Sequence, residues 1–192
     1  MPTPFQLVLG VAALVGLGVL ILHGRRVLGA WLRYRGTRVV VCPENRATVA
    51  VEIDARHAAW SVPVGKPELR LEECTRWPEK AGCGQDCLSQ IESAPEGCRL
   101  RAIVDAWYRS RPCVFCGRAF DEIRWHDRKP ALRAPDGSLI DWMAFEPQQV
   151  MDILASHKAV CRDCYQAESF RVEHPGLVTD RPRRSGPPPS ML

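Results

Sequence analysis

Two cysteine pairs in the second half of the chain have the spacing of metal ligands. Cys113 and Cys116 enclose two residues in CVFC, and Cys161 and Cys164 do the same in CRDC. Two such turns supply four thiolates, the ligand set that closes a tetrahedron around Zn²⁺ with Zn–S distances of about 2.3 Å. Two intervening residues also let backbone amides point at the sulfur atoms and spread their charge. The pattern predicts one metal site formed by these four cysteines.

Five further cysteines precede these pairs, and none of them belongs to a CxxC pair. Cys83 and Cys87 have the spacing of adjacent helix turns, which predicts that both sulfur atoms lie on one face of a helix. Together with Cys42 and Cys74 they can complete a second metal site, with Cys98 left as a buried thiol. Two alternatives stay open: Cys98 replaces Cys42, or all five are core thiols.

CVFCGR resembles the zinc knuckle of treble-clef and zinc-ribbon domains, and CRDC directly before an expected helix is closer to the treble clef. In that fold, a knuckle, a hairpin and the N-terminus of a helix surround one zinc ion. The resemblance covers roughly residues 113–173 and rests on the four paired cysteines and Gly117. It implies a zinc-organised fold and no particular activity, because such domains serve many functions. An extra helix expected at 147–158 departs from the minimal pattern.

Iron is the alternative metal. Rubredoxin-like sites use similar paired turns, and iron–sulfur clusters also take four thiolates. A zinc ion enclosed by four thiolates has no coordination position for a substrate water, which argues against hydrolysis there, so no catalytic residue is assigned. The sequence thus supports two functions: an interaction or scaffolding module with structural zinc, or an iron-thiolate or iron–sulfur protein for electron transfer or redox sensing.

The first 22 residues contain no charged side chain. PFQLVLGVAALVGLGVLIL is almost wholly aliphatic, and about 20 such residues in a helix span the hydrocarbon core of a membrane. A cleaved signal peptide fits worse, because no Lys or Arg precedes the apolar run and no small-x-small cleavage site follows it before the arginines. We therefore expect a transmembrane anchor at 1–23. Ala12 and Gly16 form a small-xxx-small pair through which two anchors can pack as a homo-oligomer.

A basic juxtamembrane segment at 24–36 follows the anchor. The arginines at and just beyond it, with no acid among them, are Arg25, Arg26, Arg33, Arg35 and Arg38. Cytoplasmic flanks are enriched in Lys and Arg, so this bias places the N-terminus outside and the remaining chain in the cytoplasm. The segment either lies along anionic headgroups or continues the helix into water. Because the cytoplasm keeps thiols reduced, nine cysteines there favour metal ligation over disulfides.

The charge of the rest of the chain argues against a nucleic-acid-binding surface. The formal net charge is +4, of which the five arginines carry +5 and the tail from Leu177 carries +2, leaving −3 for residues 39–176. A domain of this charge does not neutralise a phosphate backbone. We expect membrane lipid and a protein partner instead.

Residues 37–111 are expected to form an N-terminal α+β subdomain that contains the dispersed cysteines. β-branched runs around the CPENR turn predict a hairpin with Cys42 at its turn, and alternation in ELRLEE predicts a third strand. The expected elements are strands at 37–41, 47–54 and 68–73, and helices at 87–91 and 98–110.

Residues 112–175 are expected to form a zinc-knuckle subdomain. An Asp-Gly turn predicts a returning strand within 134–142, to which a short strand at 121–126 would be the partner. Helices are predicted at 148–158 and, after CRDC, at 165–174. The proline-rich tail at 176–192 is expected to be disordered. The predicted fold class is therefore one transmembrane helix followed by a small, metal-organised α+β domain.

Overall fold

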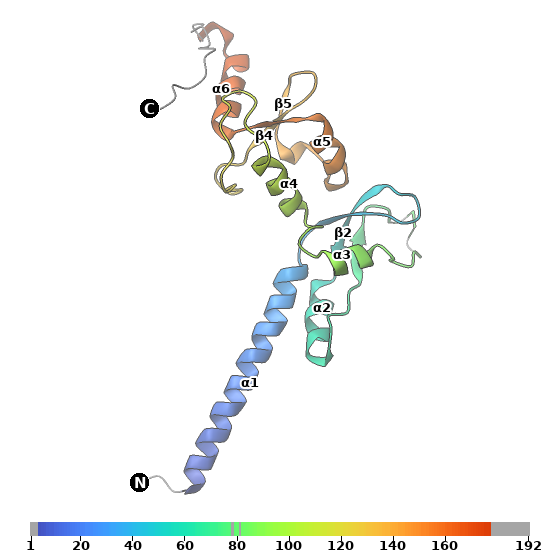
Figure 1. Cartoon of the computed structure of the whole chain (residues 1–192), viewed down its shortest axis with the longest axis vertical. Helices are drawn as coiled ribbons and strands as arrows, with labels where there is room; N and C mark the ends of the chain where they lie inside the picture. The colour runs from blue at the N-terminus through green and yellow to red at the C-terminus, as the bar shows by residue number, and fades with distance from the viewer. Residues whose placement is uncertain (1–3, 78, 81, 178–192) are drawn as a thin grey trace, which may run out of the picture. The chain divides into compact units, whose positions relative to one another are not determined.

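The computed structural model describes residues 4–177 with the exception of residues 78 and 81 (Figure 1). The described chain divides into two compact units. Unit 1 comprises the residues up to Ser110 together with Met143–Ser156, and unit 2 comprises Arg111–Trp142 and the residues from His157 onward. Residues 143–156, which the sequence assigned to the 112–175 segment, thus group with unit 1. From residue 178 onward, the tail predicted to be disordered lies outside the described residues.

Helix α1 (Pro4–Tyr34) is one α-helix of 31 residues. An 18-residue window within it has a mean hydropathy of 2.5, and none of that window is buried, so the helix is long and apolar enough to cross a membrane. Its aliphatic side chains face outward, with Leu14 exposed by 71% and Leu20 by 68%. A helix that is apolar all round suits lipid better than water. The helix continues without a break into the basic segment at 24–36 and ends at Tyr34, so the apolar run and most of the basic segment form one helix.

Strands β1 (Arg38–Val41), β2 (Thr48–Ile53) and β3 (Leu71–Cys74) form an antiparallel sheet in that order. The predicted hairpin is confirmed, with Arg38 opposite Val51 and Val41 opposite Thr48. The third strand begins later than expected, because β2 ends at Ile53, whose partner is Leu71, and the ladder stops there.

Helix α2 (Ala55–Ser61) and the 3-10 turn η1 (Val62–Val64) pack against α1. The Asp54 carboxylate caps α2 by accepting a hydrogen bond of 2.8 Å from the amide of His57. Small side chains permit the close approach, since Ala58 and Ala59 of α2 and Ala30 of α1 are all buried. The end of α1 is therefore packed into unit 1.

Two arginines from the domain reach the last turn of α1. The guanidinium of Arg38, which is fully buried, donates to the carbonyl oxygens of Arg33 and Pro95. Arg99 donates to the carbonyl oxygen of Leu32 at 2.9 Å. Carbonyl groups at a helix C-terminus lack intrahelical donors and favour positive charge, so both arginines satisfy and stabilise this end of α1. Burial lowers the pKa of Arg38, and the neighbouring Arg99 lowers it further.

Unit 1 is completed by helices that the sequence largely predicted. These are α3 (Leu88–Ser93), α4 (Leu100–Arg109) and α5 (Val150–Ser156), the last preceded by the 3-10 turns η2 (Trp142–Ala144) and η3 (Pro147–Gln149). Helix α4 buries Val104, Trp107 and Tyr108. The indole of Trp107 donates to the carbonyl oxygen of Leu154 at 2.9 Å, which joins α4 to α5.

Unit 2 contains a second antiparallel sheet, in the order β5 (Leu139–Ile140), β4 (Ala131–Arg133) and β6 (Lys158–Val160). The returning strand is present as β5, but the strand predicted at 121–126 is wrong, since those residues form turns and irregular backbone. The partner is β4, because its Ala131 and Leu132 are buried, whereas DEIRWH has no continuous apolar face.

The predicted C-terminal helix is present as α6 (Arg162–Glu173), but it begins directly after Cys161, three residues earlier than predicted, and is followed by the 3-10 turn η4 (Pro175–Leu177). Strand β6, which the sequence analysis missed, lies immediately before Cys161 and pairs with β4. The sheet therefore delivers the second cysteine pair to a fixed position.

Candidate metal centre

The first cysteine pair of unit 2 lies in a tight knuckle. The amide of Cys113 donates to the carbonyl oxygen of Arg118 at 2.9 Å, and the amide of Gly117 donates back to the carbonyl oxygen of Cys113 at 2.9 Å. Gly117 has φ +73°, in the left-handed region that glycine adopts without a steric penalty. Its position after CVFC therefore allows the chain to reverse beneath the two sulfur atoms.

The second pair lies at the N-terminus of α6. Cys161 is the N-cap residue, and Cys164 is in the first turn. The amide of Val114 donates to the carbonyl oxygen of Ala159 at 2.9 Å, which ties the knuckle to β6 just ahead of Cys161. The exposed N–H groups and the dipole at a helix N-terminus favour negative charge, so this position suits thiolates.

The four sulfur atoms of these pairs converge. The thiols of Cys113, Cys116, Cys161 and Cys164 all lie within 4.8 Å of one another. The Sγ atoms of Cys116 and Cys161 are 3.8 Å apart, and a tetrahedron with Zn–S bonds of about 2.3 Å has edges of about 3.8 Å. Within the described part of the chain, no other set of three or more metal-ligating side chains is so tightly grouped. The predicted quartet is a cluster that can bind a metal.

The thiol pKa values within this quartet are shifted in different directions. Burial raises the pKa of Cys113, but hydrogen bonds from the amides of Cys161, Cys116 and Phe115 outweigh it and lower that pKa to about 7. The amide of Cys161 donates to the Cys113 sulfur at 3.3 Å. Burial raises the pKa of both Cys161 and Cys164. Cys113 is thus the thiol best prepared to be a thiolate near neutral pH.

Unit 2 has little apolar packing to hold these elements together. Its buried residues within the described chain are Cys113, Pro130, Ala131, Leu132, Ala159 and Val160. None of the twelve residues of α6, all of them described, is buried. The cysteines at its N-terminus are therefore the natural place for α6 to be attached to the sheet.

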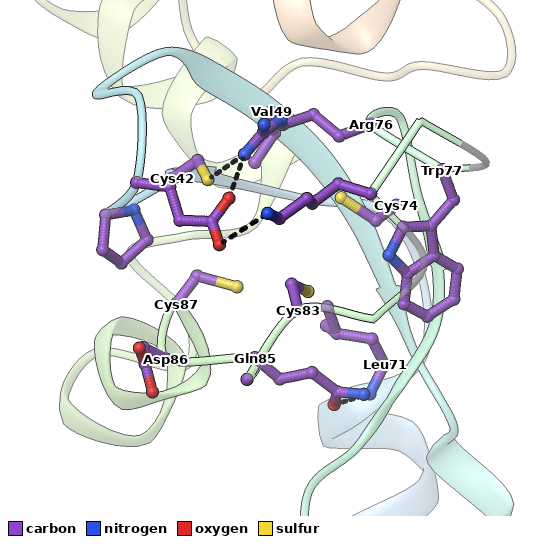
Figure 2. A pocket seen from close by; sticks show the side chains of 14 residues that line it. Cys42, Val49, Leu71, Cys74, Arg76, Trp77, Cys83, Gln85, Asp86 and Cys87 are labelled. Carbon is purple, nitrogen blue, oxygen red and sulfur yellow. Dashed lines mark hydrogen bonds and ion pairs between the residues drawn. The ribbon is translucent and has the colours of Figure 1, made fainter.

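The dispersed cysteines lie in unit 1, and four of them surround one cavity of about 30 Å³ (Figure 2). Cys42 is in the turn after β1, Cys74 ends β3, Cys83 is in the following loop, and Cys87 is the N-cap residue of α3. Cys98 does not line the cavity; its thiol lies 3.6 Å from the carbonyl oxygen of Gln90.

The prediction that Cys83 and Cys87 share a helix face is wrong. Helix α3 begins at Leu88, and Cys83 lies in irregular backbone before it. The intervening Gln85 has φ +58°, which is incompatible with a continuing right-handed helix. Both residues nevertheless reach the same cavity, because the loop turns them toward it.

Residues that the sequence analysis did not assign to a site also line this cavity, among them Arg76 and Trp77. The Arg76 guanidinium donates to the Cys42 sulfur at 2.9 Å. Burial raises the pKa of Cys42, but the hydrogen bonds that it accepts from the Glu44 backbone and from Arg76 give a net lowering. The signal in the sequence is CTRW, in which a cation and an aromatic residue follow Cys74 within three positions.

Comparisons of the chain with protein-family models, with curated proteins and with solved structures gave no match. What the protein does is therefore inferred from its own geometry.

Proposed function

We propose that the chain is a membrane-anchored zinc protein in which one structural Zn²⁺, bound by the quartet of unit 2, forms an interaction or scaffolding module. The observation that carries this proposal is the convergence of four thiols where an otherwise unburied helix meets a small sheet. Units with so small an apolar core usually need a metal or a disulfide to fold.

The quartet suits a structural zinc ion better than a catalytic metal ion. Four thiolates fill the tetrahedral shell and leave no position for a substrate water. In this proposal the knuckle, the β4–β5 hairpin and the N-terminus of α6 correspond to the three parts of a treble clef, and residues 143–156 are an insertion between them. The zinc ion then determines the shape of a surface and takes no part in a reaction.

The proposed topology has the N-terminus outside and both units in the cytoplasm. Of the five arginines behind this proposal, Arg25, Arg26, Arg33 and Arg35 are exposed and available to anionic headgroups. Arg38 is instead buried in unit 1. A reporter fused after Leu192 that works only outside the cytoplasm should be silent, and a cytoplasmic reporter should be active. The opposite pattern would contradict the topology and with it the supply of reduced thiols.

Metal analysis of the full chain, purified in detergent, tests the proposed function. We expect a colourless protein that contains zinc, and loss of one equivalent in Cys161→Ser. Visible sulfur-to-iron charge-transfer absorption, with iron in place of zinc, would support the electron-transfer or redox-sensing alternative. Full metal retention in Cys161→Ser would refute the quartet as the site.

A further inference from the structure

The cavity in unit 1 has the composition of a metal site. In Figure 2 the four labelled cysteines surround one space, and their thiol groups turn toward it. Its volume of about 30 Å³ exceeds the 10–15 Å³ or so that one water needs, so a cation fits once the thiols move inward. Three separate segments contribute: the turn after β1, the end of β3 and the loop before α3.

An unpaired hydrogen-bond donor also lines this cavity. The indole Nε1 of Trp77 is buried and has no hydrogen-bond partner. Figure 2 shows this nitrogen on the side of the ring that faces the cysteines. A buried N–H group without an acceptor is costly, and a metal-bound thiolate is an acceptor that would satisfy it.

Positive charge is available for the extra negative charge of the thiolates. Four thiolates around a divalent cation carry a net charge of −2, which needs compensation in a partly buried site. Arg76 already donates to the Cys42 sulfur, and Lys80 lines the same cavity. Glu44 pairs with Arg76 at 3.0 Å and with Lys80 at 3.8 Å, and Asp86 also lines the cavity, so Arg76 is the cation that compensates a cysteine sulfur by direct contact.

We propose that the four thiols around this cavity form a second site for a thiophilic divalent cation, zinc above all: Cys42, Cys74, Cys83 and Cys87. On binding, the thiols lose their protons to solvent and close around the ion, and Cys98 stays outside the site. The segments that must move are the turn and the loop, because Cys74 is held in the sheet opposite Val51. This proposal does not rest on the metal of unit 2.

The first experiment counts metal per full-length chain in detergent. We expect two equivalents of zinc in the native chain and in Cys98→Ser, a half-buried thiol of the same unit that does not line the cavity. We expect one equivalent in Cys87→Ser and one in Cys113→Ser. Two equivalents in Cys87→Ser would overturn the second site. One equivalent in the native chain that disappears in Cys113→Ser would overturn it too, while leaving the proposed function intact.

The second experiment reports on unit 1 alone, because the metal site of unit 2 is removed from the chain that it uses. In a chain that carries Cys113→Ser and Cys116→Ser, Co²⁺ replaces zinc as a coloured probe of the remaining site. Replacing one thiolate by imidazole shifts the Co²⁺ ligand-field bands, so Cys83→His should change the spectrum and retain one equivalent. The matched Cys98→His should not change it. Identical spectra for both, or no bound Co²⁺ in the parent chain, would overturn the proposal, as would a disulfide found among the four cysteines.

Discussion

The two cysteine quartets differ in how closely the fold alone brings their sulfur atoms together. In unit 2 all four lie within 4.8 Å, whereas in unit 1 they stand around a cavity at wider separations. The unit 2 ligands form two local pairs, one held by a turn and the other by a helix end, so the fold has to bring only two segments together. The unit 1 ligands are dispersed along the chain, so the fold has to place each cysteine separately. Paired spacing therefore organises a site before a metal arrives, and dispersed spacing relies on the surrounding fold.

The two units also differ in their apolar cores, and here unit 1 is the better packed. Unit 1 buries a cluster of larger apolar side chains that includes Val40, Val51, Ile53 and Ile91. The described part of unit 2 buries few apolar side chains, and its helix α6 has no fully buried residue. We infer that metal loss should unfold unit 2 but should only loosen the turn and loop of unit 1.

The largest effect is expected from Cys164→Ser. It leaves an incomplete site and forfeits a metal contribution of about 10 kcal/mol, which is comparable with the stability of a whole domain. Hydrogen exchange followed by mass spectrometry should show the amides of α6 losing protection while those of β1 and β2 keep it. Cys98→Ser is the control, with a cost of about 1–3 kcal/mol for burying a hydroxyl and no loss of metal. Preserved protection of α6 in Cys164→Ser would contradict the dependence of unit 2 on its metal.

The next effect concerns pH. The raised pKa values of Cys161 and Cys164 mean that both thiols hold protons near neutral pH, and a metal must displace them. Affinity at the unit 2 site should therefore rise by at least about a hundredfold per pH unit. Below the Cys113 pKa of about 7, one more proton must leave and the dependence should steepen.

The pKa of Cys113 also predicts in which direction pH changes the stability of unit 2 when no metal is bound. The pKa of Cys113 is lowered by folding, so its thiolate adds stability above its unfolded pKa, and that stability is lost as pH falls through about 7. Competition with a chromophoric chelator across this range measures the metal affinity. A slope below tenfold per pH unit would show that the thiols are already ionised.

A smaller effect is expected from Arg76→Gln, which tests the second site alone. It removes a charged donor to the Cys42 sulfur, a kind of bond worth about 1.5 kcal/mol or more, so Co²⁺ affinity in unit 1 should fall by about tenfold. Arg70→Gln is the matched control, because Arg70 pairs with Asp54 and does not line the cavity. Equal affinities in the two variants would remove Arg76 from the site.

The smallest effect is expected from Gly117→Ala. The added Cβ meets nothing within 4 Å, so the cost is the left-handed backbone alone, about 1 kcal/mol, or roughly fivefold in metal affinity at unit 2. Gly137 also has a positive φ in unit 2 but lies in the β4–β5 turn. Gly137→Ala should destabilise that turn and leave the affinity unchanged. A larger loss in Gly137→Ala than in Gly117→Ala would mean that the hairpin, not the knuckle, limits binding.

The parts of the fold that the sequence predicted are those with local signals. The β1–β2 hairpin follows from β-branched runs, α4 from its apolar spacing, and the unit 2 quartet from two CxxC turns. Strand β6 has only three residues and is stabilised by its pairing with β4. That pairing joins distant parts of the sequence, so no local sequence pattern predicts it. The loop that brings Cys83 and Cys87 to the cavity depends on the backbone of Gln85, which no residue type announces.

The buried Arg38 and its neighbour Arg99 connect α1 to the sheet of unit 1. Because both guanidinium groups donate to carbonyl oxygens in the last turn of α1, side-chain hydrogen bonds reinforce the backbone connection between helix and sheet. Arg38 also starts β1, the strand that leads directly into the turn bearing Cys42. If α1 spans a membrane, we expect a change in its tilt or axial rotation to be passed through these hydrogen bonds to the cysteine-bearing sheet.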